Sequence, residues 1–191
     1  MEAKQAFIGE YVNKAPRDRI SLLMEHFGDF EAFRDNYREC VINLMVMMRE
    51  YNIRPGDDGL GVRVQTTSGT SKITESKAMD RYEIEECFNK KKIKKKMFPD
   101  PYEHGLISTA LFEYDLMEKE YRILEGFIKL MKPDERSLLI PYIKRETRVG
   151  DIASELCIEM ESASKRVYRI RKALLQKVLP WFKEYKISVP A

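Results

Sequence analysis

The chain has 191 residues, of which 43% are hydrophobic and 34% charged, and its formal net charge is +3. This balance is typical of a folded globular chain and excludes a disordered one. No apolar stretch approaches the ~20 residues of a membrane span, and the start lacks the apolar run of a secretory leader, so we expect a cytoplasmic protein and no membrane partner. Cys40, Cys87 and Cys157 are far apart and odd in number. They predict buried, reduced thiols rather than a disulfide framework.

Residues 1–51 are predicted to form an N-terminal helical unit. Residues 2–13 and 17–27 each show helical apolar spacing, and Gly28 is a natural end for the second helix. Asp29 suits the N-cap of a longer helix that runs to about Tyr51. The buried stripe of that helix is predicted to comprise Phe30, Phe33, Tyr37, Val41, Leu44, Met45 and Met48. Such a methionine-rich stripe is typical of a bundle core, which we favour, or of a partner or dimer surface.

A change of composition follows the N-terminal unit. Residues 52–73 are rich in turn formers and small polar residues, which predicts a linker. Residues 74–132 are predicted to form a middle helical segment, with one helix from about residue 75 to 97 and a long second helix from about residue 102 to 132. The first of these helices is predicted to end in a lysine run, Lys90–Lys96, in which six of seven residues are lysine. Phosphate contact and a merely solvated face are equally open interpretations of that run.

No catalytic constellation emerges from the sequence. His26 and His104 have no cysteine, aspartate or histidine at metal-binding spacing. We recognise no Ser-His-Asp arrangement, no paired carboxylates and no nucleotide-binding loop. We therefore predict a protein that is not an enzyme, with no catalytic residue, no metal and no cofactor.

Residues 133–191 contain three predicted helical segments. The first begins at Pro133, which is tolerated at the first helical position, and Pro141 should kink or shorten it. The second runs from about Val149 to Leu156, with Thr147 as a plausible N-cap. The third begins near Ser162. Its apolar stripe at helical spacing consists of Ala163, Val167, Ile170 and Leu174.

Positive charge gathers in this last segment. Residues 144–191 hold eleven Lys and Arg against six Asp and Glu, whereas residues 1–60 hold eight against eleven. Two short helices joined by a tight turn, the second basic on its outer face, are typical of a helix-turn-helix that reads DNA. The competing interpretation is a small helical bundle whose basic residues are merely solvated.

The same stretch resembles a known family. Glu135-Arg136, Tyr142 and Asp151-Ile152-Ala153 with Leu156 resemble the region-4 segment of bacterial sigma factors. The run Val167-Tyr168-Arg169-Ile170-Arg171, followed by Ala173-Leu174, most resembles the phage-borne transcription regulators of the ArpU/RinA type. The resemblance covers roughly the last third of the chain. It departs from the family at Cys157, where glycine is frequent, and at Glu159, where serine often opens the recognition helix.

The resemblance implies a fold and a function. The fold would be all-α, with helical N-terminal and middle parts and a C-terminal sigma region-4-like helix-turn-helix in residues 133–191. The function would be that of a phage or prophage regulator in a bacterial host, binding double-stranded DNA and activating late or packaging genes. Two alternatives stay open: a sigma-like factor acting through RNA polymerase, and a protein-interaction module with a degenerate helix-turn-helix. The oligomeric state is also open.

The predicted DNA contacts follow from their place on the third helix. Residues outside the buried stripe and near the helix start are best placed to reach base edges. These residues are Ser162, Lys165, Arg166 and Arg169. Arg148 and Lys172 are better suited to phosphate contact.

Overall fold

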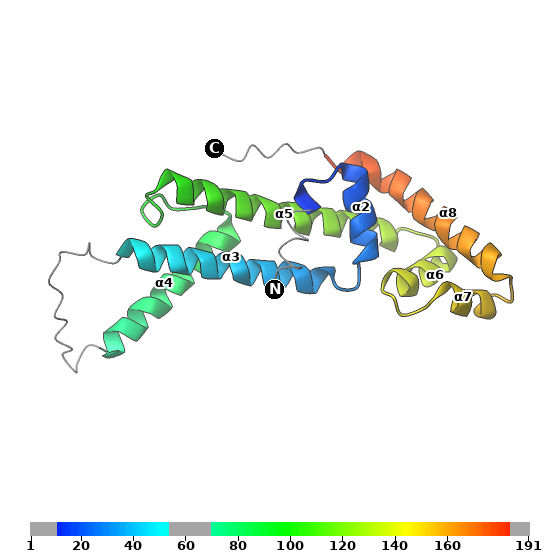
Figure 1. The fold of residues 1–191 in the computed structure, drawn as a ribbon, viewed down its shortest axis with the longest axis horizontal. Helices are drawn as coiled ribbons and strands as arrows, with labels where there is room; N and C mark the ends of the chain where they lie inside the picture. Colours follow the sequence, from blue (N-terminus) through cyan, green and yellow to red (C-terminus); the bar gives the residue numbers. More distant parts are fainter. Residues whose placement is uncertain (1–10, 54–69, 184–191) are drawn as a thin grey trace. The chain divides into compact units, whose positions relative to one another are not determined.

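The chain is all-α in a computed structural model that describes residues 11–53 and 70–183 (Figure 1). Within these ranges there are seven α-helices, one 3-10 turn and no strand, which confirms the predicted fold class. The elements are α2 Pro16–Glu25, α3 Phe30–Ile53, α4 Thr70–Lys90, α5 Pro101–Lys129, α6 Pro133–Ile143, α7 Val149–Glu155, α8 Met160–Val178 and η1 Leu179–Trp181. Most of the predicted helix 2–13 and most of the predicted linker 52–73 lie outside the described residues. The described ends of that linker, at residues 52–53 and 70–73, are helical.

Two compact units make up the chain. Among the described residues, unit 1 comprises 11–35 and 113–183, and unit 2 comprises 36–53 and 70–112. Unit 1 is therefore assembled from two segments that are far apart in the sequence. The predicted four-part organisation of the chain stays a prediction.

A buried ion pair links the distant segments of unit 1. The side chains of Arg19 and Glu120 are only 1% and 3% exposed, and Nη2 of Arg19 lies 2.7 Å from Oε1 of Glu120. Nε of Arg19 donates to Oε2 of Glu120 at 2.9 Å, and the Tyr11 hydroxyl donates to the same oxygen at 2.5 Å. Arg19 also donates to the carbonyl oxygens of Lys14 and Lys183, at 2.8 and 2.6 Å. Because these contacts satisfy the polar atoms, they compensate the cost of removing both charges from water.

Aromatic packing completes the same core. The rings of Phe27 and Phe30 stack on Tyr121 of α5, with centroids 5.3 and 5.2 Å apart. Such pairs add stability beyond the apolar area that they bury. Ile20, Leu23 and Met24 of α2, together with Phe27 just after it, are buried.

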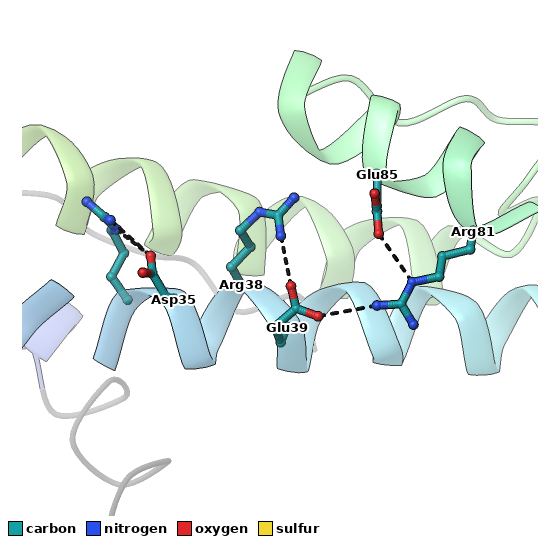
Figure 2. A network of polar contacts seen from close by, with 6 residues as sticks. Asp35, Arg38, Glu39, Arg81 and Glu85 are labelled. Carbon is teal, nitrogen blue, oxygen red and sulfur yellow. Dashed lines mark hydrogen bonds and ion pairs between the residues drawn. The ribbon is translucent and has the colours of Figure 1, made fainter. Parts of the chain in front are cut away.

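Unit 2 joins α3 and α4 through a polar network (Figure 2). Nη2 of Arg81, on α4, lies 3.3 Å from Oε2 of Glu39, on α3, and Nε of Arg81 lies 3.2 Å from Oε1 of Glu85. Nη1 of Arg38 lies 2.8 Å from Oε1 of Glu39. Arg81 and Glu39 are about half exposed, so each pair is expected to contribute roughly 0–1 kcal/mol. These exposed pairs therefore add little to the stability of unit 2.

Most of the lysine run lies beyond the end of the helix that was predicted to contain it. Helix α4 ends at Lys90 rather than near Met97. Lys91 adopts a positive φ of 52°, and its backbone N–H bonds to the carbonyl of Phe88 while that of Lys92 bonds to Cys87. This is the Schellman pattern that ends a helix. Lysine is a good helix former, so composition alone favoured a longer helix.

The cysteine prediction needs a correction. All three cysteines are free, but only Cys87 is buried, whereas Cys40 and Cys157 are exposed. Cys40 lies on an exposed position of α3, and Cys157 lies in the turn between α7 and α8. An exposed helix position and a turn both leave the side chain in contact with water, so neither thiol is buried.

Candidate functional site

The candidate site begins at the C-terminal end of helix α6 and the turn that follows it. Pro141 stands inside α6, which ends two residues later at Ile143. Arg145 then takes a positive φ of 61°. Its N–H bonds to the carbonyl of Tyr142 at 3.1 Å, and the N–H of Glu146 bonds to the carbonyl of Pro141 at 2.9 Å. This second Schellman ending turns the chain sharply toward α7.

The N-cap of α7 is Arg148, so the predicted cap Thr147 is wrong. The Asp151 carboxylate accepts a hydrogen bond from the Arg148 backbone N–H at 2.7 Å, which is half of a capping box. A carboxylate three residues inside the helix therefore fixes its start. The hydroxyl of Thr147 is buried and makes no hydrogen bond within the described part of the chain.

A four-residue turn, 156–159, joins α7 to α8. Cys157 has a φ of 51°. Its N–H bonds to the carbonyl of Ser154 at 3.2 Å, and the N–H of Ile158 bonds to that of Ala153 at 3.0 Å. Cysteine thus occupies the left-handed position that glycine favours at a helix end.

Helix α8 buries the predicted stripe. Ala163, Val167, Ile170 and Leu174 are all buried, and Val178 extends the stripe by one further turn. The helix begins at Met160, slightly before the predicted start, and packs against α7, α6 and α2, all within unit 1 (Figure 1). Burial of one face fixes which side chains of α8 point outward.

The predicted DNA-contacting residues all lie on the surface of unit 1. Lys165 and Arg169 lie on the side of α8 away from the buried stripe, whereas Ser162 and Arg166 flank it. Lys165 Nζ lies 2.6 Å from Glu161 Oε1, and both side chains are well exposed, so this pair is weak. The exposed set is Arg148, Ser162, Lys165, Arg166, Arg169 and Lys172.

Two adjoining hollows beside α8 are lined partly by arginines that the sequence analysis did not select as site residues. One, of about 450 Å³ between α2 and α8, is lined by Arg17, Arg171 and Lys172 among others. The other, of about 700 Å³ beside the α6–α7 connection, is lined by Arg145, Arg148 and, again, Arg171. Among the described residues, the only carboxylate that lines either hollow is that of Glu25, in the second.

Charge counting along the chain could not have revealed this gathering of cations. Arg17 lies in the acidic first third of the sequence, and Arg145 lies in a connection rather than on the predicted reading helix. Arg145 also donates to the carbonyl oxygen of Glu25 at the end of α2, at 3.3 Å. A cation at that place suits the negative end of the helix dipole.

This chain matches no protein-family model, no curated protein and no solved structure. Among the residues described, no group of three or more His, Cys, Asp and Glu could hold a metal ion. No helix in the same ranges is long and apolar enough to cross a membrane. The resemblance to sigma region 4 therefore rests on the motif residues alone.

Proposed function

We propose that this chain is a DNA-binding transcription regulator of phage or prophage origin, in which α7, the turn and α8 form a helix-turn-helix. The observation that carries the proposal is α8 itself, which buries a continuous apolar face and presents basic residues on its exposed faces. A short helix and a four-residue turn precede it, as in proteins that place the second helix in the major groove. The sequence resemblance adds the ArpU/RinA type and the activation of late or packaging genes.

The contacts would divide between bases and phosphates. Lys165, Arg166 and Arg169 lie in the first half of α8, the part of a recognition helix that reaches base edges. Arginine and lysine read guanine through its two major-groove acceptors. Lys165 would exchange its exposed Glu161 partner for DNA at a cost of about 0.2–0.5 kcal/mol. Arg148 and Lys172 would contact phosphates, joined by the other arginines of the two hollows.

The test compares binding to an operator selected from genomic fragments with binding to random duplex DNA. Lys165→Ala, Arg166→Ala and Arg169→Ala should weaken operator binding more than random binding, since one bidentate contact discriminates by roughly 1–3 kcal/mol. Lys172→Ala should weaken both about equally and lower the salt slope by about one unit.

Lys177→Ala is the matched control, because it removes one exposed cation from the last turn of the same helix. It should leave the ratio of operator binding to random binding unchanged. Circular dichroism must show that each variant keeps its helices. If all three base-contact variants are folded and bind operator as tightly as the parent, α8 is not the reader.

A protein-interaction module is the second candidate function. Four exposed carboxylates surround the turn and would suit a basic protein partner: Asp151, Glu155, Glu159 and Glu161. Two of them already have partners, because Asp151 caps α7 and Glu161 pairs with Lys165. Because two of the four carboxylates are already paired within the protein, fewer are available to a basic partner, which favours the DNA proposal.

Co-purification with RNA polymerase would separate a sigma-like factor from a regulator that binds DNA alone.

A further inference from the structure

The connection between α4 and α5 carries a second concentration of positive charge, in unit 2. We call residues Lys90–Lys96 the lysine loop. All six of its lysines are exposed, while Ile93 is partly buried. The loop begins at the last residue of α4, Lys90, and precedes two buried residues, Met97 and Phe98.

Buried side chains hold both ends of the lysine loop. Before it, Cys87 and Phe88 are each 2% exposed, and after it, Met97 and Phe98 are 3% and 1% exposed. The sulfur atoms of Cys87 and Met97 lie 3.6 Å apart across the loop. The guanidinium of Arg38 lies 5.4 Å from the centre of the Phe88 ring. Buried side chains therefore fix the position of the loop at both of its ends.

Backbone hydrogen bonds give the loop a defined path. The Schellman bonds at Lys91 and Lys92 close its first turn, and the N–H of Met97 bonds to the carbonyl of Lys94 at 2.9 Å to close its last. Lys90 pairs with Glu86 at 2.6 Å. Within the described ranges, none of the ion pairs involves Lys92, Lys94, Lys95 or Lys96. Like charges concentrated in this way attract polyanions and release counterions when they bind.

We propose that the lysine loop is a second DNA-contacting surface, which binds the phosphate backbone of duplex DNA without reading its sequence. The choice of DNA among polyanions rests on the function proposed for α8. The lysine side chains of the loop suit contact with the phosphate backbone of DNA. Lysine is a flexible point charge that positions a protein on phosphate but carries no sequence information. The partly buried Ile93 leaves no exposed apolar anchor in the loop of the kind that a protein partner would bury.

The experiment measures the salt dependence of binding to random-sequence duplex DNA by fluorescence anisotropy, with the full chain. Each phosphate neutralised contributes about 0.9 to the slope of log K against log salt. Lys94→Gln with Lys95→Gln should therefore lower the slope by about 1.8. Lys119→Gln with Lys129→Gln is the matched control, since it removes the same charge from lysines already paired within α5. Its slope should stay near that of the parent.

The outcomes separate this proposal from the function proposed for α8. The lysine-loop variant should keep the ratio of operator binding to random binding, which the three base-contact variants of α8 lower. An unchanged slope in the lysine-loop variant, or an equal fall in the control, overturns the lysine-loop proposal whatever the α8 variants do. So does binding to vesicles of mixed phosphatidylserine and phosphatidylcholine that depends on the loop while the DNA slope does not. A lower slope together with unaffected α8 variants would support the loop and sink the α8 assignment.

Discussion

Replacing Cys157 by glycine should stabilise the protein. Cys157 has a φ of 51°, in the left-handed region, which costs an L-residue about 1–2 kcal/mol. Glycine adopts this region freely, but it makes the unfolded chain more flexible by about 0.4–1 kcal/mol. The thiol contributes little, because it is exposed and lies 3.8 Å from the carbonyl oxygen of Ser154. The net gain should therefore be about 0.8 kcal/mol.

Urea unfolding followed by circular dichroism measures this gain. For a chain of this size it corresponds to a rise in melting temperature of about 2–3 °C. Cys157→Ala is the control, since it removes the thiol but keeps the Cβ atom that makes the conformation costly. Its stability should stay within about 0.5 kcal/mol of the parent. The difference between the glycine and alanine variants then isolates the backbone effect.

A second site provides an internal comparison. Arg145 has a similar φ of 61° but also donates a hydrogen bond to the Glu25 carbonyl. Arg145→Gly should therefore gain less than Cys157→Gly, because it loses that bond along with the strain. Equal stabilities for the glycine and alanine variants at residue 157 would refute the reasoning, since the left-handed conformation would then cost nothing.

Three further predictions concern the core and the thiols. Glu120→Ala should destabilise the protein by about 3–5 kcal/mol in urea unfolding, because it leaves the buried charge of Arg19 without its partner. Burial, and then the neighbouring Glu120, raise the pKa of Tyr11 well above its ordinary value of 10.0. The raised pKa of Tyr11 stabilises the folded state below pH 10.0, and this stabilisation is lost as the pH rises toward the folded-state pKa. Tyr11→Phe should thus show a shallower loss of stability above that pH. Two thiols should react with a colorimetric thiol reagent in the folded protein and the third only after unfolding, because only Cys87 is buried.

Local periodicity explains what the sequence could predict. The buried stripe of α8 follows from apolar residues four, three and four positions apart, a pattern confined to one helix. The start of α6 at Pro133 is equally local, since proline is accepted at a first helical position. The α7 cap was mispredicted because threonine is a favoured N-cap residue and arginine is not, so the residue type did not mark Arg148.

Contacts between distant residues explain what the sequence could not predict. Arg19 and Glu120 are 101 positions apart, and charged residues are rarely buried, so no sequence pattern marks them as a pair. The same holds for the hollows beside α8, where Arg17 of α2 joins Arg171. The end of α4 before Lys91 was also hidden, because the glycine that usually marks such an end is missing.

The order of residues in unit 1 has a consequence for synthesis on the ribosome. Tyr11 and Arg19 are synthesised before the carboxylate that they bind, which is on Glu120 and follows about a hundred residues later. The Lys183 carbonyl that accepts from Arg19 comes later still. Domains generally fold from the N-terminus as the chain grows, but here the whole segment 36–112 is made before unit 1 can close. Residues 11–35 therefore lack the rest of their core until residues 113–183 have followed, and α8 can pack against α2 only at that stage.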